Sequence, residues 1–464
     1  MPGPSGIERS ADAPVLPAGE NLIDLTVAAP VIPAERALGA ARGPIAFWSA
    51  PDPGAGGNRW SIAGWGEAAR LEAEGEARLE EVALRAARLL GRIEARGEGA
   101  ADGAPGLRLL GGFAFLPGAQ AAGDRTIAPP WRDFADASFT LPRWSYATDG
   151  ERAFVRAVVP RGEAAAAARE MGARCREIEA AGRSPGGAPT RAGRHVELVA
   201  PEAWRALVRD ALASIRAGEL EKVVTAAPSL FEAEREISPA PLLARLGEGY
   251  PDCAHFAFQR GAGVFVGATP ERLLGVRGRA VEADGLAGSA PRRAGGDVTA
   301  AEDLLASGKD RREHALVVDA IAAALRPACA ALAVPETPVV RTLRNVHHLW
   351  SPIVGTLARP VHLLELAARL HPTPAVCGTP RAAAIRWILG REPAPRGWYA
   401  GGVGWFDEAG GGALWVGIRA GLLEGRRAFL YAGGGIVEGS DADAELAETR
   451  IKRRPMLAAL GAPL

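Results

Sequence analysis

Short hydrophobic runs separated by turn residues dominate the first third of the chain. The runs PIAFWSA (44–50), RWSIAGWG (59–66), GGFAFLP (111–117) and AFVRAVV (153–159) have the length and composition of β-strands. The segment LEEVALRAARLLGRIEA (79–95) repeats its apolar residues at the spacing of an amphipathic helix. This part of the chain therefore predicts a sheet together with a helix.

Two segments rich in Pro, Gly and Ala have no hydrophobic period, and they predict the boundaries of the folded parts. Residues 1–20 are expected to form a flexible leader, and AGRSPGGAPTRAGR (181–194) is expected to form a surface loop. We therefore expect an amino-terminal subdomain over residues 21–180 and a second region over residues 195–464.

The second region alternates helical and strand-like patterns. A helix is predicted over 201–219, with Pro201 in its first turn and Gly218 at its end, and the strand KVVTAA (222–227) follows directly. Further strands are predicted at 254–259, 263–269, 397–407, 413–424 and 427–437, and further helices near 300–330, 361–370 and 441–460. The pattern predicts a mixed α/β protein.

The charge and cysteine content narrow the class of protein. Lys plus Arg and Asp plus Glu each count 54, so no net charge favours nucleic acid or an anionic membrane surface as a partner. The four cysteines form no CxxC pair, which disfavours a structural zinc site or a disulfide framework. The sequence shows no secretory signal and no apolar stretch of transmembrane length. We expect a cytoplasmic protein that acts on a small molecule.

Lys222 and Glu271 are the first candidates for chemistry. Lys222 opens a short strand directly after a helix, and Glu271 follows Pro270 in the turn-like segment GATPERL. In a cleft, desolvation would lower the pKa of the lysine and raise that of the carboxyl group, which suits a general base and a general acid. A solvated lysine and an exposed ion pair between Glu271 and Arg272 are the alternatives.

Two predicted helical segments, KDRREHALVVDAI and DADAELAETRIKR, each carry acidic residues three positions apart. These are Asp310 with Glu313 and Glu445 with Glu448, and Lys452 continues the second helix face. Each pair could be an ordinary solvated surface. If the two faces meet across a cleft, however, their oxygen ligands suit Mg²⁺.

Glycine-rich segments and two cationic residues complete the candidates. LAGSAPR (286–292) and AGGGIV (432–437) follow strand-like runs, where glycine allows backbone amides to approach an anion, although a tight hairpin would explain them equally well. Arg419 lies inside an apolar strand-like run, where it needs an anionic partner from the core or from a ligand. His348 precedes an apolar pair and could also be a core histidine.

Taken in order, these segments resemble the chorismate-binding enzymes, which comprise isochorismate, salicylate, anthranilate and aminodeoxychorismate synthases. Upstream, WSIAGWGEAARL, GGFAFLP and WRDFADASFTLPRW look like the amino-terminal half of isochorismate synthases. The resemblance covers residues 195–464 most clearly, through the segments EKVVTAA, GATPERL, LAGSAPR, KDRREHALVVDAI, NVHHLWSPIVGTL, HPTPAVCGTPR, RGWYAGGVGW, WVGIRAG, AGGGIVEGSDADAE and ELAETRIK.

The resemblance implies a fold and a set of roles. The fold would be a single α/β (α+β) domain of two packed, mainly antiparallel β-sheets flanked by helices, with residues 195–464 as its chorismate-binding catalytic region. Glu313 and Glu448 would bind Mg²⁺, with Asp310 and Glu445 behind them, although Asp310 replaces the commoner glutamate. The implied catalytic pair is Lys222, which would activate water, and Glu271, which would protonate the departing hydroxyl group. The implied substrate-binding residues are Gly288, Ser289, His348, Ala375, Tyr399, Arg419, Gly435 and Lys452.

Two positions favour an isochorismate synthase within this family. Lys222 stands at the water-activating position, whereas the members that transfer ammonia lack a lysine there, so no amidotransferase subunit is expected. Ala375 stands where members that also eliminate pyruvate usually carry threonine. The chain departs from the family at Thr225, Ala226 and Ala227, where an arginine is common, and in LAGS, which replaces LAGT.

We therefore predict a Mg²⁺-dependent, monomeric isomerase that converts chorismate to isochorismate without an organic cofactor. A salicylate synthase, which would also release pyruvate, is the first alternative. A noncatalytic protein that binds a chorismate-like metabolite is the second. The sequence leaves open whether the product serves menaquinone, siderophore or salicylate synthesis.

Overall fold

The computed structural model describes residues 21–51, 60–95, 103–118, 127–183, 193–292, 298–344 and 346–462. The predicted leader at 1–20 and most of the predicted loop at 181–194 lie outside these ranges, and the proposed subdomain boundaries stay predictions. The strands are β1 (Leu22–Ala28), β2 (Ile45–Ser49), β3 (Ser61–Ala73), β4 (Ile93–Ala95), β5 (Arg108–Phe113), β6 (Ala137–Thr148), β7 (Ala153–Pro160), β8 (Gly193–Glu197), β9 (Lys222–Ala233), β10 (Ala254–Arg260), β11 (Gly263–Thr269), β12 (Arg272–Arg277), β13 (Ala280–Pro291), β14 (Cys329–Ala333), β15 (Val339–Thr342), β16 (Val346–Leu357), β17 (Gly378–Thr379), β18 (Gly402–Asp407), β19 (Gly412–Val416), β20 (Ala420–Glu424) and β21 (Arg427–Val437).

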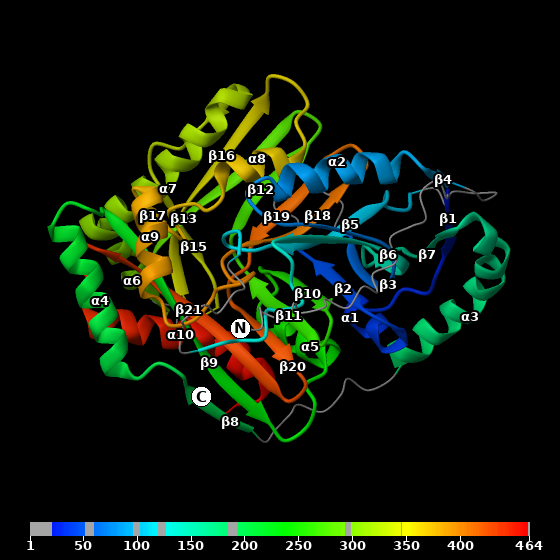
Figure 1. Cartoon of the computed structure of the whole chain (residues 1–464), viewed down its shortest axis with the longest axis horizontal. Coiled ribbons are helices and arrows are strands. Elements are labelled where there is room, and N and C mark those ends of the chain that lie inside the picture. Colours follow the sequence, from blue (N-terminus) through cyan, green and yellow to red (C-terminus); the bar gives the residue numbers. More distant parts are fainter. Residues whose placement is uncertain are drawn as a thin grey trace, which may run out of the picture.

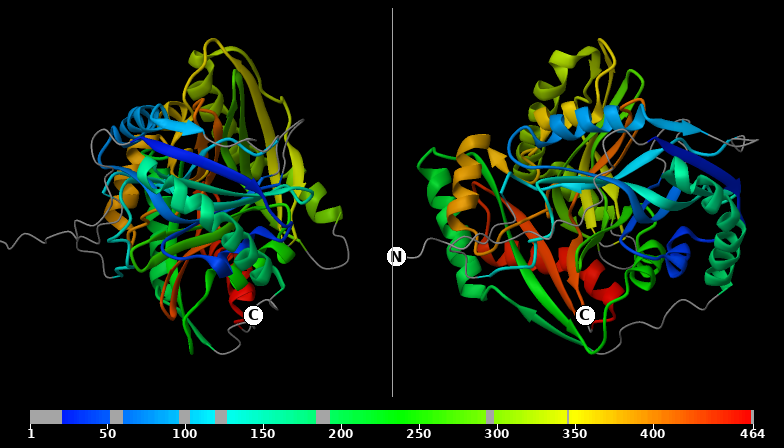
Figure 2. Two further views of the ribbon diagram at one scale, coloured as in Figure 1. Left: turned by 90° about the vertical axis from the view of Figure 1, so that its right-hand side faces the viewer. Right: turned by 45° about the vertical axis from the view of Figure 1, so that its right-hand side comes forward.

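Helices cover both ends and the outer faces of these strands. They are α1 (Ala34–Ala37), α2 (Arg78–Leu90), α3 (Ala164–Arg183), α4 (Pro201–Arg216), α5 (Pro239–Gly249), α6 (Val298–Ala306), α7 (Gly308–Leu325), α8 (Leu363–Leu370), α9 (Arg381–Arg391) and α10 (Ala442–Leu460). Helix α7 packs on β13 and β16, α10 packs on β21, and α3 packs on β7 (Figure 1). Helices α3 and α4 lie at opposite ends of the molecule, as Figures 1 and 2 show. None of the helices in the described ranges is long and apolar enough to cross a membrane.

The strands form one continuous hydrogen-bonded network with two arms that meet at β6. Strand β6 pairs with β3 on one edge and with β5 and β7 on the other. One arm continues from β3 through β2, β10, β11, β20 and β21 to β9, and the other continues from β5 through β18, β19, β12 and β13 to β16. Among the described strands, every pair except β1 with β4 is antiparallel. The predicted α+β class is confirmed, and the two expected sheets are the arms of this network.

Two buried clusters of apolar side chains hold the arms and helices together. The larger cluster combines residues of both arms, including Phe258, Phe265 and Leu414. The smaller one lies where α3, α5 and α10 contact the strands, and it includes Met171 and Met456. Burial of this much apolar surface is the main stabilising contribution to such a fold. The candidate catalytic residues therefore lie on strands and helices that are packed together by these two clusters.

The structure corrects two predicted helices. The helix predicted over 79–95 ends at Leu90, and Ile93–Ala95 instead forms β4, which pairs with β1. The helix predicted near 300–330 is two helices, because Ser307 interrupts it and caps α7: its side chain accepts a hydrogen bond from the Asp310 backbone N–H. Capping thus fixes the start of the helix that carries Asp310 and Glu313.

Two predicted strands also differ from the structure. The strand predicted over 397–407 starts only at Gly402, and the strand predicted over 413–424 is divided into β19 and β20. Arg419 lies in the break, with a φ of 50°, rather than inside a strand. A non-glycine residue in the left-handed region costs of order 1–3 kcal/mol, so the surrounding structure must hold it there.

Candidate active site

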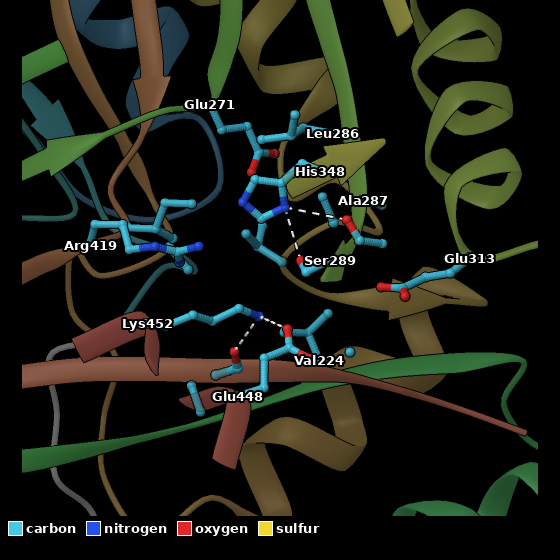
Figure 3. Close-up of a pocket in the computed structure, with 18 of the residues that line it drawn as sticks. Val224, Glu271, Leu286, Ala287, Ser289, Glu313, His348, Arg419, Glu448 and Lys452 are labelled. Carbon is cyan, nitrogen blue, oxygen red and sulfur yellow. Dashed lines mark hydrogen bonds and ion pairs between the residues drawn. The ribbon is translucent and has the colours of Figure 1, made fainter. Parts of the chain in front are cut away.

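A cavity of ≈ 230 Å³ lies where β9, β13 and β21 meet α7 and α10. The side chains of Glu271, Arg419 and Lys452 point into it from different sides (Figure 3). Of the predicted site residues, those that line the cavity are Glu271, Gly288, Ser289, Asp310, Glu313, His348, Ala375, Tyr399, Arg419, Gly435, Glu445, Glu448 and Lys452. Apart from Lys222, the structure thus brings all of the predicted residues to the lining of one cavity.

Lys222 lies just behind this wall, at the first position of β9. Its side chain is 1 % exposed, and Nζ lies 2.9 Å from Glu313 Oε1. A β-carbon at Gly435 would lie 2.5 Å from Glu313 Oε1 and 3.2 Å from Lys222 Cε. A side chain at Gly435 would displace the Glu313 carboxylate, so glycine leaves room for the ion pair behind the wall. The solvated lysine that the sequence left open is therefore excluded.

Glu271 is buried in the turn between β11 and β12. Burial, together with the negative charge of the nearby Asp284, raises the pKa of its carboxyl group to about 8 against the opposing effect of Arg419, Lys222 and Lys452. The exposed ion pair with Arg272 does not form: Arg272 instead donates to Glu282 and Asp284. Glu271 is therefore a protonated carboxylic acid at neutral pH, facing the cavity.

Four carboxyl groups from α7 and α10 gather at the opposite side of the cavity. Glu448 is ion-paired with Lys452, at 2.5 Å between Oε1 and Nζ, and although burial opposes ionisation this pairing holds the pKa of Glu448 below its usual value. Burial raises the pKa values of Asp310 and Glu445, and the negative charge of Glu448 raises both further. The solvated-face alternatives are thus wrong, since these acidic groups lie close enough to repel one another.

This donor set suits a hard divalent cation. Glu313 and Glu448 offer carboxylate oxygens from two helices that face the same cavity. The described residues contain no group of three or more His, Cys, Asp or Glu side chains that could hold a metal ion. Mg²⁺ commonly uses one or two protein carboxylates and completes its shell with water and an anionic ligand. The residues present therefore fit Mg²⁺ bound jointly with a substrate.

Ser289 and His348 form a polar pair above the carboxylates. His348 Nδ1 lies 2.9 Å from Ser289 Oγ and 3.3 Å from the Gly288 carbonyl oxygen, while Nε2 has no protein partner. Gly288 adopts a φ of 73° at an irregularity in the pairing of β13 with β16, which turns this segment towards α7. Burial, with the positive charge of Arg419 next, holds the pKa of His348 well below its usual value. His348 is thus a neutral imidazole with one nitrogen free for a ligand.

Arg419 and Tyr399 form a third side of the cavity. Among the described residues, Arg419 makes no ion pair, so the core-carboxylate partner that the sequence allowed is absent there. Tyr399 stacks on Tyr431, with ring centroids 4.8 Å apart, and this contact fixes its orientation. An unpaired guanidinium group in a partly buried cavity is a natural site for a ligand carboxylate.

The three lysines of the chain show a feature that the sequence analysis missed. Of the 54 Lys and Arg residues, only Lys222, Lys309 and Lys452 are lysines. Each forms an ion pair with a carboxylate of the cavity, and Lys309 pairs with Glu445 at 3.5 Å. Lys309 was not predicted, although the rarity of lysine in an arginine-rich chain could have indicated it. We refer to these three residues as the lysine cluster.

Other lining residues were also missed. Val224 and Ala226 alternate with Lys222 along β9, so the two-residue period of a strand could have placed them on the same face. Arg396 has no such signal, because it lies in an irregular segment between α9 and β18.

Comparisons with known proteins agree with this geometry. Residues 22–461 match the family model described as chorismate binding enzyme. The chain is 37% identical over 431 residues to the salicylate biosynthesis isochorismate synthase of Pseudomonas aeruginosa, covering 90% of this chain and 85% of that protein. It is 44% identical over 271 residues to isochorismate synthase DhbC of Bacillus subtilis, covering 56% of this chain and 68% of that protein. The structure is similar to that of MenF, the menaquinone-specific isochorismate synthase from Escherichia coli, with a TM-score of 0.73, 26% identity and 95% of each chain covered.

Proposed function

The chain belongs to the chorismate-binding enzymes, and on that premise we propose that it is an isochorismate synthase, an isomerase that converts chorismate to isochorismate. One observation carries the proposal: the cavity combines a carboxyl group whose pKa burial raises, Glu271, with a buried lysine just behind the cavity wall, Lys222. Water is a poor nucleophile and hydroxide a poor leaving group, so this reaction needs both an acid and a base.

We propose for the two residues the roles that the family resemblance implies. In its neutral amine form, Lys222 accepts a proton from a water molecule as that water attacks C2 of the ring, and Glu271 donates its proton to the hydroxyl group that leaves C4. The ring double bonds shift between these two carbons. One water molecule is added and one is released, so chorismate and isochorismate have the same composition. General acids and bases typically contribute about 10²–10⁴-fold each to the rate.

We also propose that Glu313 and Glu448 hold Mg²⁺ against the ring carboxylate, with Asp310 and Glu445 behind them. When bound, the cation supplies positive charge that neutralises this carboxylate. The crowding of four carboxyl groups from two helices supports the proposal, since their mutual repulsion falls when a cation lies between them.

The remaining lining residues orient the substrate. The unpaired guanidinium group of Arg419 and the hydroxyl group of Tyr399 suit the second carboxylate of chorismate. Ser289 and His348 offer uncharged hydrogen-bonding groups to the substrate, a hydroxyl group and a neutral imidazole. Gly288 and Gly435 leave space for close backbone contacts.

A salicylate synthase remains the second candidate. Ala375 supports the isomerase. It presents only a methyl group to the cavity, whereas the pyruvate-releasing members of the family usually carry threonine at this position. Lys222 supports water rather than ammonia as the nucleophile, so we propose that no amidotransferase subunit is needed. The monomeric state, the cytoplasmic location and the pathway served stay predictions.

The test is to incubate the purified protein with chorismate and Mg²⁺ and to measure isochorismate by chromatography and pyruvate with lactate dehydrogenase. Isochorismate without stoichiometric pyruvate is the expected result. Stoichiometric pyruvate would favour the salicylate synthase, and tight binding of chorismate without turnover would favour a noncatalytic protein.

A further inference from the structure

One edge of β9 lacks a neighbouring strand where it passes the cavity. Strand β21 covers the other edge of β9 from Lys222 to Glu232, whereas β17 is only two residues long and pairs with Lys222 and Val223. The Val224 backbone N–H still donates to the Cys377 carbonyl, at 2.8 Å. Between that point and Ser229, where β8 begins to pair with β9, the backbone groups on this edge need partners that are not a strand.

Two side chains supply these partners. Arg396 Nη2 donates to the Val224 carbonyl at 2.7 Å, and Glu392 Oε1 accepts from the Ala226 backbone N–H at 2.8 Å. The two side chains therefore continue the hydrogen-bond ladder of β9 where β17 ends. Both Val224 and Ala226 line the cavity, so the ladder is completed directly at the proposed active site.

Arg396 and Glu392 also bind each other. Arg396 Nε donates to Glu392 Oε2 at 2.9 Å, and Arg396 Nη2 donates to Glu392 Oε1 at 2.5 Å. The ion pair is therefore bidentate. Arg396 Nη1 donates to the Val376 carbonyl at 2.7 Å, and the guanidinium carbon lies 4.2 Å from the Phe115 ring centroid. Both side chains are buried, and four of the five N–H donors of the guanidinium group are engaged in these hydrogen bonds. Arg396 thus serves mainly to hold protein groups together rather than to bind a ligand.

These contacts join two segments that line the site, the start of β9 and the segment that ends at Val376. Strand β9 begins with Lys222, and the segment that ends at Val376 carries Ala375 on the cavity wall. The Arg396 backbone carbonyl accepts from the Tyr399 N–H at 2.9 Å, which ties in the turn that carries Tyr399. One ion pair therefore connects three segments that line the cavity.

We propose that Arg396 and Glu392 are positioning residues, which act as a clamp that sets the spacing between β9, with Lys222, and the wall formed by residues 375–376. This inference rests on the proposed function. Because misplacement of a catalytic group by about 1 Å can cost about 10²-fold in rate, the clamp controls turnover more than substrate affinity. The guanidinium fork is required, since an ammonium group cannot serve two carbonyls and a carboxylate in one plane.

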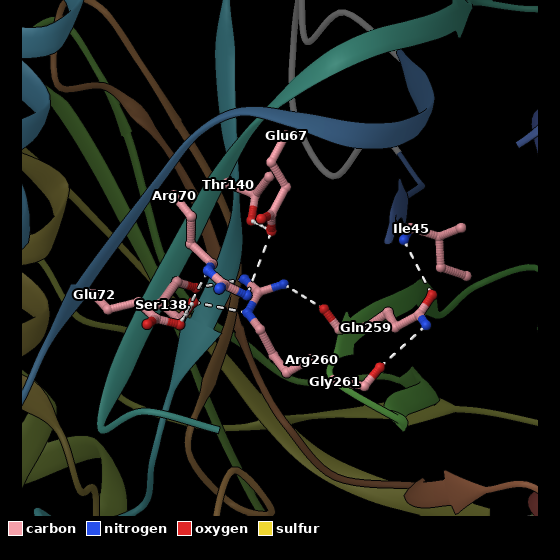
Figure 4. A network of polar contacts seen from close by, with 9 residues as sticks. All are labelled: Ile45, Glu67, Arg70, Glu72, Ser138, Thr140, Gln259, Arg260 and Gly261. Carbon is pink, nitrogen blue, oxygen red and sulfur yellow. Dashed lines mark hydrogen bonds and ion pairs between the residues drawn. The ribbon is translucent and has the colours of Figure 1, made fainter. Parts of the chain in front are cut away.

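The test compares Arg396→Lys and Glu392→Gln with Arg260→Lys as a matched control. Arg260 is another buried arginine whose guanidinium group bonds backbone carbonyls, those of Ser138 and Gln259, but it does not line the cavity (Figure 4). We expect Arg396→Lys to lower kcat about 10- to 100-fold while KM for chorismate changes less than about threefold.

Arg260→Lys is expected to lower the melting temperature but to keep kcat within about twofold. Equal kcat values for Arg396→Lys and the wild type would overturn the inference.

Glu392→Gln keeps an acceptor for the Ala226 N–H and removes only the negative charge. It therefore disturbs the folded structure less than Arg396→Lys does. We expect it to show a smaller loss of kcat than Arg396→Lys, again with little change in KM. If Arg396→Lys does not fold, the same comparison is made with Glu392→Gln, and an unchanged kcat in that variant would overturn the inference.

Amide hydrogen exchange gives a readout that does not depend on turnover. Peptides covering residues 222–227 and 373–377 are expected to exchange at least about tenfold faster in the Arg396 or Glu392 variant than in the wild type, whereas Arg260→Lys leaves them unchanged. Unchanged exchange in these peptides would contradict the clamp. A wild-type protein that does not convert chorismate would contradict the proposed function instead, and the exchange experiment would still decide the clamp.

Discussion

Lys222 Nζ lies 2.9 Å from Glu313 Oε1, so the strand that carries the proposed base and the helix that carries a proposed metal ligand meet at one point. This contact connects segments 91 positions apart through a single ion pair. The proposed base and the proposed metal ligand therefore share one contact, and each proposed role of the site can be tested by one substitution.

Replacement of the proposed base is the first prediction. Lys222→Ala is expected to lower kcat/KM for chorismate by about 10²–10⁴-fold, because no other described amine takes its place behind Gly435. Lys222→Arg is the matched variant, since it keeps a cation beside Glu313 but cannot give up its proton near neutral pH. We expect both to be inactive with wild-type circular dichroism. Activity in the arginine variant would show that only the charge matters.

The second prediction concerns the proposed acid. Glu271→Gln keeps the size and hydrogen-bonding shape of the side chain but cannot donate a carboxylic proton, so isochorismate formation is expected to fall by about 10²–10⁴-fold. Chorismate binding, measured by calorimetry with Mg²⁺, should change little. Near-normal turnover in this variant would refute the assigned role.

The pH dependence follows from the environment of Glu271. The acid works only when protonated, so kcat/KM is expected to fall as the pH rises through the pKa of about 8. The charged groups that act on Glu271 are Asp284, Arg419, Lys222 and Lys452. Asp284→Asn removes the negative charge that raises the pKa, so the alkaline limb should move to lower pH. A limb that stays in place or moves upwards would exclude Glu271 as the titrating acid.

Metal dependence gives the fourth prediction. Chelation with EDTA should abolish activity, and added Mg²⁺ should restore it. Glu313→Gln and Glu448→Gln are each expected to weaken Mg²⁺ binding at least about tenfold, seen as a smaller rise in melting temperature with Mg²⁺ and chorismate together. Full activity of the wild type in EDTA would remove the metal from the proposal.

The elements of the site were largely predictable from the sequence, because local patterns determine them. Short strand-like apolar runs identified β9 and β21, and helical spacing identified α10 and the faces of its carboxylates. The pairing of β2 with β10, which joins residues about 210 positions apart, could not be predicted, because register between distant strands depends on packing. The break at Arg419 was missed for the same reason: its left-handed backbone is imposed by tertiary contacts rather than by the residue itself.

Arg396 and Glu392 show why the framework behind a site is harder to predict than the site. They are four positions apart, yet α9 ends at Arg391, so their contact is not a helical pair. Their partners on β9 lie 166 and 172 positions away. Only the folded chain shows that this ion pair completes a strand edge.

The lysine cluster has a practical consequence for handling the protein. Reagents that acylate ε-amino groups can react with its side chains only at the cavity, where Lys309 is 38 % exposed, Lys452 14 % and Lys222 1 %. Dyes, cross-linkers or resins coupled through lysine would therefore attach first at Lys309, which lines the cavity, and would block the cavity or change their signal when it is occupied. Occupancy of the cavity by a ligand should in turn protect these amines, so protection from acylation offers a binding assay that needs no turnover.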